Sequence, residues 1–437
     1  MSSRSVVVPA PRRAAATRAA ASPPRPERRS ASGLQRERHE PDYLILIATI
    51  ALAAIGILMI YSSSGVRSYL DNQDAFSEVG PQLLWALLGL VTMAIMARLD
   101  YRYLRLVSVP GYLVSVVLLV LVLLPGVGTV VGGSARWLQI GTLPAIHPAE
   151  FAKLALVVYL AHWLARRGTR VGSLLHGSLP FLLIVGPVLA LVFLEPDLGT
   201  TGVLTLTAFT MFVVAGANLW QLLLLVPAGA AAVAYGVLHE SYQLARVRAF
   251  LDPWADPLGI GYHTVQGLMA LGLGGLTGRG LGASREAGSL YLPNAANDFI
   301  FAVVSQELGF VGGATVVGLF LLLAYRGLRV ALSAPDSFGA LLATGITAWL
   351  VLQAFINIGV VVNLLPITGI TLPFVSDGGS SLTVSFAAVG ILLSISRETQ
   401  PRGTWNDADP DRGRGNRRAH LPGAGSHREP ARAGTGR

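Results

Sequence analysis

Long apolar blocks, each about as long as a bilayer-spanning helix, constrain this sequence more than any other feature. A helix needs about 20 apolar residues to cross the hydrocarbon core of a membrane. The chain of 437 residues is 52% hydrophobic and only 13% charged, whereas soluble domains carry about 25% charged residues. The sequence therefore predicts an all-α, polytopic membrane protein with about ten transmembrane helices, at roughly 43–62, 81–98, 108–125, 149–165, 179–195, 198–216, 219–237, 298–323, 338–363 and 380–397.

Arginines follow the second, fourth, eighth and tenth predicted spans, which orients the chain in the membrane. They are Arg98, Arg102, Arg105, Arg166, Arg167, Arg170, Arg326, Arg329, Arg397 and Arg402. The positive-inside rule makes this side cytoplasmic, together with both termini. The extracytoplasmic side then receives several shorter loops, including 62–80 and 126–148, and one large loop at about 238–297.

Two basic tails flank the predicted ten-helix domain at 43–397. Residues 1–40 hold nine Arg against three Glu, and residues 401–437 hold eight Arg against four acidic residues. Neither has apolar periodicity, so we expect residues 1–42 and 398–437 to be disordered cytoplasmic tails. The first 40 residues lack the apolar core of a secretory signal. Because the positive-inside effect already explains basic tails, no nucleic-acid partner is predicted.

The large loop carries four arginines on the extracytoplasmic side, where arginine is otherwise rare: Arg246, Arg248, Arg279 and Arg285. They suggest an anionic ligand. Alternatively, they pair with acidic residues of the same loop or keep the loop soluble. Apolar residues at Val265–Leu273 are spaced for a short amphipathic helix that could lie on the membrane. Six glycines follow at 272–282, but no Lys-Ser/Thr pair comes after them, so this is not a nucleotide-binding loop of the P-loop type.

Ionisable and amide side chains inside the predicted spans need partners, because polar groups are costly at membrane depth. Glu150 and Lys153 are three residues apart, so they predict a salt bridge at the start of the fourth span, or a pair that shapes a substrate cavity. Gln353 and Asn357 share a helix face and predict interhelical hydrogen bonds. Glu307 is either a functional residue or part of a structural network.

Asp298 stands at the start of the eighth span, directly after the large loop. Aspartate is a favoured helix N-cap, and an anion suits the positive end of a helix. The same environment favours the ionised form that a catalytic base needs. From the residues alone, both a capping and a catalytic role are open.

Several motifs together resemble the SEDS family (shape, elongation, division and sporulation proteins), over about residues 43–397. They are Gly133–Leu138, Pro148–Lys153, Tyr242–Pro253, Gly261–Gln266, Gly280–Ser284, Leu292–Ala302, Glu307–Gly309, Leu365–Phe374 and Gly378-Gly379-Ser380-Ser381. Thr371–Phe374 is more similar to the division type (FtsW-like) than to the elongation type (RodA-like).

Some positions depart from the family pattern. Gln306 stands where a first Glu usually precedes Glu307, so a role that needs two carboxylates is not supported there. Asp377 stands where Tyr is usual, Ala296-Asn297 replaces a common His-Thr pair, and Ala287 lies where Lys is often found. Arg285 could take over the phosphate contact of that lysine.

The resemblance implies a peptidoglycan glycosyltransferase of the cytoplasmic membrane that polymerises lipid II and releases undecaprenyl pyrophosphate, with a role in septal wall synthesis. It implies Asp298 as general base and the four loop arginines with Arg136 as cations for the pyrophosphate. Glu150, Lys153, Glu307, Gln353, Asn357 and Ser380 would shape the cavity.

The implied partners are a class B penicillin-binding protein and other division membrane proteins. No cage of oxygen ligands predicts a metal site, although Mg²⁺ or Mn²⁺ could share the charge of the pyrophosphate. The alternatives are a flippase for the lipid-linked precursor, an elongation role, or a non-catalytic scaffold.

Overall fold

The computed structural model describes residues 40–73, 77, 79–131, 134–139, 145–239, 241–284, 292 and 295–398. The predicted basic tails lie outside these residues, except for residues 40–42 and 398. All the described residues belong to one compact unit.

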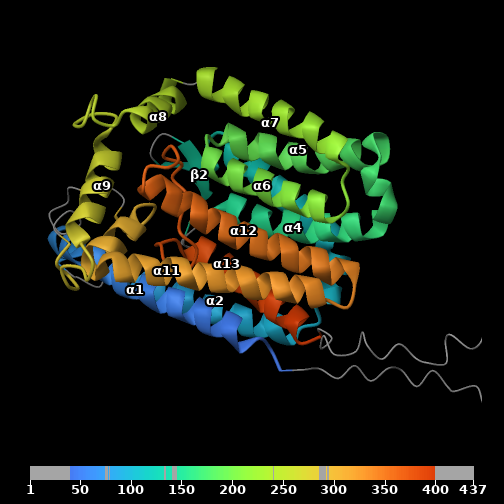
Figure 1. Cartoon of the computed structure of the whole chain (residues 1–437), viewed down its shortest axis with the longest axis horizontal. Coiled ribbons are helices and arrows are strands. Elements are labelled where there is room, and N and C mark those ends of the chain that lie inside the picture. The colour runs from blue at the N-terminus through green and yellow to red at the C-terminus, as the bar shows by residue number, and fades with distance from the viewer. Residues whose placement is uncertain are drawn as a thin grey trace, which may run out of the picture. The chain divides into compact units, whose positions relative to one another are not determined.

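Twelve α-helices account for most of the described residues (Figure 1). They are α1 (Tyr43–Asn72), α2 (Val79–Arg98), α3 (Leu104–Leu123), α4 (Pro148–Arg167), α5 (Leu179–Leu194), α6 (Leu198–Val214), α7 (Leu219–His239), α8 (Ser241–Leu251), α9 (Tyr262–Gly274), α11 (Ile300–Ser333), α12 (Ser337–Val361) and α13 (Gly379–Ser396). The strands β1 (Gly128–Val131) and β2 (Ser134–Leu138) form an antiparallel hairpin. Sequence reasoning did not predict this hairpin within the loop at 126–148.

The ten predicted spans correspond to α1–α7 and α11–α13. Seven of these helices are long and apolar enough to cross a membrane, and α6 and α7 contain shorter apolar helices. The tenth, α4, carries buried Glu150 and Lys153 near its start and two arginines in its last turn. The chain is therefore an all-α polytopic membrane protein, as its apolar blocks predict.

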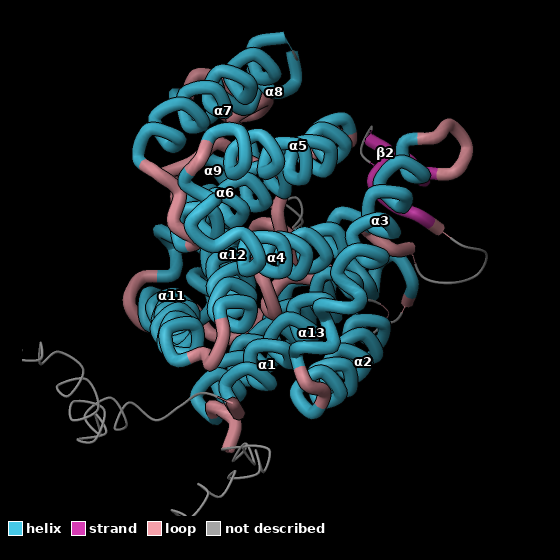
Figure 2. The backbone as a smooth tube through the Cα atoms, turned by 90° about the vertical axis from the view of Figure 1, so that its right-hand side faces the viewer, coloured by secondary structure: helices cyan, strands magenta, loops and turns pink. Residues whose placement is uncertain are grey.

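Helices α4, α12 and α13 lie inside the bundle, with the other long helices around them (Figure 2). Small residues let helices approach closely where no hydrophobic effect drives them together. A Cβ on Gly89 of α2 would lie 2.4 Å from the ring of Phe386 on α13, and one on Gly390 would lie 2.5 Å from the carbonyl oxygen of Met93. These two glycines therefore set the close contact of α2 with α13.

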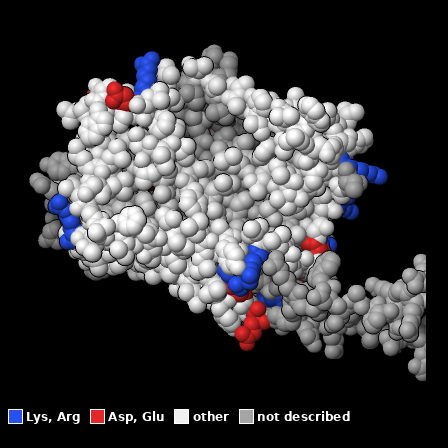
Figure 3. All heavy atoms as spheres, in the orientation of Figure 1, with Lys and Arg blue, Asp and Glu red and all other residues white. Residues whose placement is uncertain are grey.

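Large apolar side chains on α2, α3 and α7 are exposed, as expected of helices that face lipid. Examples are Leu87, Leu113, Val117 and Leu223, each more than half exposed. Figure 3 shows one face of the molecule, on which Lys, Arg, Asp and Glu are few and lie near the edges. This distribution fits a bilayer-embedded surface.

Ion pairs gather at one end of the bundle, which we call the charged end. Arg102 lies 3.1 Å from Asp336 and 2.8 Å from Glu398. Arg326 pairs with Asp42 through its Nε at 2.7 Å. Helix α11 continues to Ser333, so Arg326 lies within a helix, and the predicted end of this span at 323 is ten residues too early. An arginine can occupy such a position because its long apolar stem packs against the helix while its guanidinium group reaches a polar partner.

The opposite end carries α8, α9 and the hairpin, and we call it the pocket end. Helix α1 extends to Asn72 toward this end, where the sequence predicted a loop from residue 62. The predicted helix at 265–273 is present as part of α9. Its buried residues, including Val265 and Ala270, face α11 and α12. Helix α8 lies in the predicted large loop, at a place where no helix was predicted.

The glycine-rich segment after α9 fills a break in α11. Gly309 has φ 71° and ψ −166°, which interrupts the helix. The N–H groups of Arg279 and Gly280 donate to the carbonyls of Gln306 and Glu307 at 3.1 and 3.0 Å. These bonds satisfy helix carbonyls on one side of the break. The close approach needs glycine, because a Cβ on Gly278 would lie 2.0 Å from the carbonyl oxygen of Glu307.

Candidate active site

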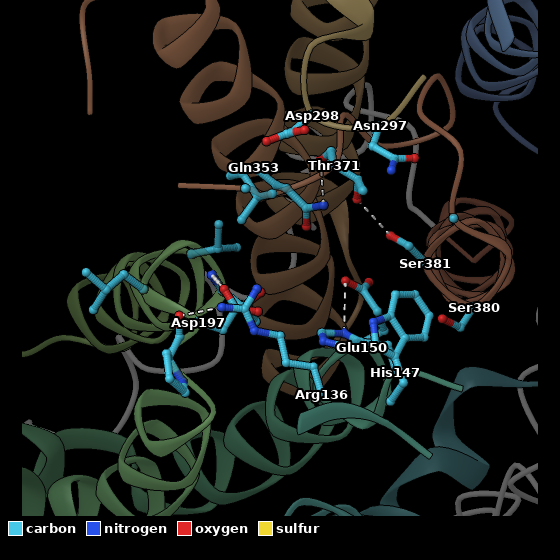
Figure 4. A pocket seen from close by; sticks show the side chains of 18 of the residues that line it. Arg136, His147, Glu150, Asp197, Asn297, Asp298, Gln353, Thr371, Ser380 and Ser381 are labelled. Carbon is cyan, nitrogen blue, oxygen red and sulfur yellow. Dashed lines mark hydrogen bonds and ion pairs between the residues drawn. The ribbon is translucent and has the colours of Figure 1, made fainter. Parts of the chain in front are cut away.

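A pocket of about 1000 Å³ opens near the pocket end of the bundle (Figure 4). Its walls come from segments that are far apart in the sequence. The lining residues include Trp85, Arg136, His147, Glu150, Asp197, Gln243, Arg246, Asn297, Asp298, Gln353, Thr371, Asp377, Ser380 and Ser381. Apolar residues such as Phe193, Leu194 and Ile370 share the lining with them, so the pocket can hold polar and apolar parts of one ligand.

Asp298 lines this pocket from the turn that precedes α11. Helix α11 begins at Ile300, and its N-cap residue is Phe299, which makes no side-chain capping hydrogen bond. The capping interpretation of Asp298 is therefore not supported at the N-cap position. The side chain is buried, and burial raises its pKa to about 6, while its own backbone N–H and Arg246 act in the opposite direction. At neutral pH the carboxyl group is mainly ionised.

Two of the predicted cations, Arg246 and Arg136, also line the pocket. Arg246 extends from α8, and its Nη1 donates to the carbonyl of Ile367 at 3.2 Å. Arg136 lies on β2. Its Nε and Nη2 donate to the carbonyls of Glu195 and Pro196 at 2.9 and 2.6 Å. Backbone carbonyls thus fix both guanidinium groups at the rim of the same pocket as Asp298.

The predicted salt bridge between Glu150 and Lys153 is present. Lys153 Nζ lies 2.8 Å from Glu150 Oε2 and donates to Gln353 Oε1, also at 2.8 Å. Gln353 Nε2 then donates to the carbonyl of Thr371 at 2.9 Å. Gln353 therefore makes the predicted interhelical hydrogen bond, and this chain of contacts runs from α4 through α12 to the pocket wall. Asn357 donates instead to the carbonyls of Asp298 and Ile370, which lie outside the helices. Figure 4 shows Asp298, Gln353 and Thr371 on one side and Arg136 and Asp197 on the other.

The remaining predicted site residues fall in different places. Ser380 lines the pocket at the start of α13. Glu307 is buried and accepts a hydrogen bond from the hydroxyl of Ser62 at 2.6 Å, outside the pocket. Arg248 and Arg279 are exposed and do not line the pocket, and Arg279 Nε donates to the carbonyl of Leu273. Arg285 lies outside the described residues.

Sequence reasoning missed several residues of the pocket, notably Asp197 and His147. Asp197 Oδ1 caps α6 by accepting from the N–H of Thr200 at 2.9 Å. His147 precedes α4, and burial lowers its pKa, which favours the neutral ring. Glu195, next to Arg136, is buried, and burial raises its pKa to about 8. The sequence did contain a signal for this part of the pocket, because Glu195 and Asp197 stand in a loop of three residues between two apolar spans.

Among the described residues, no group of three or more His, Asp or Glu side chains is arranged to hold a metal ion. Mg²⁺ commonly binds through one or two carboxylates together with substrate phosphates and water. A divalent cation at this pocket would accordingly take most of its ligands from the substrate and from water.

Fold and pocket together define a polytopic α-helical membrane protein with a polar, charged pocket near one end of its bundle. Comparison with known sequences places it more narrowly. The chain belongs to the FtsW/RodA/SpoVE family, whose sequence model, described as "Cell cycle protein", matches residues 42–401. This match confirms the resemblance that the motifs indicate.

Individual relatives cover nearly the same region. The chain is 43% identical to stage V sporulation protein E of Bacillus subtilis over 361 residues, which cover 83% of this chain and 98% of that protein. It is 40% identical to a "Probable peptidoglycan glycosyltransferase FtsW" of Trichlorobacter lovleyi over 362 residues, 82% of this chain and 93% of the relative.

Solved structures agree with the fold. A chain from a structure described as "Structural coordination of polymerization and crosslinking by a peptidoglycan synthase complex" matches with a TM-score of 0.68 and 30% identity, covering 82% of this chain and 98% of that one. The rod shape determining protein RodA of Thermus thermophilus matches with a TM-score of 0.61 and 28% identity, covering 83% and 98%.

Proposed function

We propose that this protein is a peptidoglycan glycosyltransferase that polymerises lipid II on the outer side of the cytoplasmic membrane. The observation that carries the proposal is the buried carboxyl group of Asp298 in one pocket with Arg246 and Arg136. Relatives named as peptidoglycan glycosyltransferases cover most of the chain. A base and cations in one pocket are what a transfer from a pyrophosphate-linked donor requires.

In the proposed reaction, the 4-hydroxyl oxygen of the acceptor sugar attacks the anomeric carbon of the lipid-linked donor. Asp298 takes the hydroxyl proton as the new C–O bond forms. The bond from the anomeric carbon to the pyrophosphate oxygen breaks, and undecaprenyl pyrophosphate leaves with its electron pair. The configuration at the anomeric carbon inverts. General-base assistance of this kind contributes about 10²- to 10⁴-fold to a rate.

The arginines serve the leaving group in this proposal. Negative charge builds up on the pyrophosphate as the bond breaks, and positioned cations stabilise that transition state. Arginine suits phosphate because its planar guanidinium group bonds two oxygens at once. Arg246 and Arg136 line the pocket and are the first candidates. Arg248, Arg279 and Arg285 stay predictions as further cations for the pyrophosphate.

A flippase is the competing function, and it would use ionisable residues along a path through the membrane. Glu150 and Lys153 are paired with each other, and Lys153 also binds Gln353. Glu307 is engaged by Ser62. Because these three residues have fixed partners, their contacts indicate a structural role. The polar pocket around Asp298 favours an enzyme over a flippase.

The membrane setting of the proposal follows the positive-inside rule, with both termini in the cytoplasm and the pocket end outside. We further propose a role in septal wall synthesis beside a class B penicillin-binding protein and other division proteins. The structural relative described as a peptidoglycan synthase complex coordinating polymerisation and crosslinking supports a partner of this kind. An elongation role is the alternative.

A polymerisation assay on purified protein tests the function. Wild type, Asp298→Ala and Asp298→Asn would be incubated with labelled lipid II, with and without partner and with Mg²⁺ or Mn²⁺. Asp256→Asn is the matched control, because Asp256 lies in the large loop, is exposed, and accepts two backbone hydrogen bonds, of which the single side-chain oxygen of asparagine can keep one. We expect glycan from wild type and the control only.

Polymer from Asp298→Ala at the wild-type level would remove Asp298 from the proposed role. A translocation assay in vesicles separates the competing function. Lipid II flipping by wild type and Asp298→Ala alike, without polymer from either, would favour a transporter.

A further inference from the structure

Three consecutive carbonyls in the turn before α11 each accept a hydrogen bond from α12 or from the segment between α12 and α13. The donors and acceptors are Asp377 N–H to Ala296 at 2.9 Å, Ser376 Oγ to Asn297 at 2.6 Å, and Asn357 Nδ2 to Asp298 at 2.8 Å. The turn that carries the proposed base is thus held at every residue from 296 to 298.

The segment that holds this turn is itself closely fixed. Asn357 Nδ2 also donates to the carbonyl of Ile370 at 2.8 Å, and the Ser376 hydroxyl accepts from the N–H of Leu372 at 2.8 Å. Phe374 has φ 67°, a left-handed conformation that is rare for a bulky residue. Such conformations persist where the surroundings over-determine them. The segment 370–377 is therefore a rigid support and not a passive loop.

Helix α1 closes the support from behind. A Cβ on Gly56 would lie 2.5 Å from the carbonyl oxygen of Phe374 and 2.6 Å from the Cα of Val375. The backbone of the segment therefore rests directly on the backbone of α1. The support has little room to move away from the turn that it holds.

Backbone position decides where the Asp298 carboxyl group can reach. Only two rotatable bonds connect this carboxyl group to the backbone. Its direction in the pocket thus follows from the turn. We propose that Ser376 and Asn357 are positioning residues for Asp298. Their hydrogen bonds hold the base in its reactive orientation, and neither side chain touches the reacting atoms. This inference rests on the proposed function, because it concerns the reactivity of Asp298.

The chemistry of the two side chains gives different ways to break the support. Ser376→Ala removes a donor to Asn297 and an acceptor for Leu372. Ser376→Cys keeps the size of the side chain but donates only weakly. Asn357→Asp keeps the shape, but an ionised carboxylate cannot donate to the two carbonyls that Asn357 holds. A misplacement of about 1 Å can cost about 100-fold in rate.

A kinetic comparison on the full chain tests the inference. The variants Ser376→Ala, Ser376→Cys and Asn357→Asp would be purified, and kcat, KM and Tm measured with lipid II. Ser394→Ala is the matched control, because Ser394 Oγ likewise donates to a backbone carbonyl, that of Leu99, but at the charged end of the bundle. We expect kcat to fall about 10- to 100-fold in Ser376→Ala and Asn357→Asp. Ser376→Cys should be intermediate, KM should change less than about twofold, and the control should keep its kcat.

The outcomes separate the inference from the function on which it rests. If wild type makes no glycan, the proposed function fails. If wild type is active and the three variants keep the kcat of the control, the positioning role is refuted. A loss that appears only in KM, or only in proportion to a fall in Tm, also refutes it. Ser376→Cys keeps the test decisive should the alanine variant not fold.

Discussion

The acid limb of the pH–rate profile offers the sharpest test of the electrostatics of the pocket. Burial raises the pKa of Asp298 to about 6, and Arg246 opposes this rise. A general base must be ionised to accept a proton, so kcat/KM should fall as the pH drops through this value. Removing the positive charge in Arg246→Gln should move the limb to higher pH, because the ionised carboxylate loses a favourable neighbour.

The size of the effect follows from the pKa. With a pKa of about 6, roughly nine-tenths of the Asp298 side chains are ionised at pH 7 and roughly one-tenth at pH 5. The rate should therefore fall about tenfold between these two pH values, with a slope of one below the pKa. Because Arg246 is also a proposed contact for pyrophosphate, its loss should lower the rate at every pH as well. The pH at which the acid limb falls reports the pKa of Asp298 alone, separately from this overall loss of rate.

The assay is initial-rate polymerisation of lipid II between about pH 4.5 and 8.5, run at constant ionic strength. Arg248→Gln is the control, since it makes the same charge change on the same helix at an exposed residue outside the pocket. Its acid limb should stay with that of wild type. A limb that moves to lower pH in Arg246→Gln, or that persists unchanged in the residual activity of Asp298→Asn, would refute the reasoning.

Three further substitutions test the scaffold by thermal unfolding in detergent. Lys153→Met leaves the buried Glu150 carboxylate without its cation and should cost about 3–5 kcal/mol; the double variant with Glu150→Gln should recover most of this loss, and no recovery would argue against the ion pair as its cause. Gly309→Ala should cost about 1–3 kcal/mol, because φ 71° with ψ −166° suits glycine alone; an unchanged Tm would show that the break in α11 is not maintained. Burial raises the pKa of Glu195 from 4.5 to about 8, so between these values the folded state binds more protons than the unfolded state, and stability falls as pH rises. Glu195→Gln should remove this decline, which shows as a Tm gain over wild type at pH 8 that is larger than the gain at pH 5.

Much of the fold follows from the sequence because lipid imposes simple rules. Apolar blocks of about 20 residues correspond to ten helices, seven of which are long and apolar enough to cross a membrane, and the i, i+3 spacing of Glu150 and Lys153 gives their salt bridge. Helix ends were less predictable. Helix α1 runs to Asn72 and α11 to Ser333, because a helix can continue beyond the apolar region wherever its backbone remains hydrogen-bonded.

The pocket could be predicted only in part. Asp298, Arg136 and Arg246 were proposed from residue type and from motifs, and the structure brings them to one pocket. Nothing in the sequence distinguishes among the arginines of the large loop. Arg246 lines the pocket, whereas Arg248, only two residues further on, is exposed and does not. On a helix, residues two apart point to different sides. Without knowledge of α8, the sequence offered no means of choosing between them.

The way in which Arg136 is held explains how a pocket beside a membrane can keep a cation ready for phosphate. A carboxylate partner would fix the guanidinium group but would also cancel its charge. Arg136 instead donates to two neutral carbonyls, those of Glu195 and Pro196. Glu195, whose carbonyl Arg136 binds, has its side-chain pKa raised to about 8 by burial, so its carboxyl group is mainly neutral at pH 7 and competes little with a phosphate for this charge. The same local burial that suppresses the acid therefore preserves the field of the arginine in the pocket, where a pyrophosphate leaving group would need it.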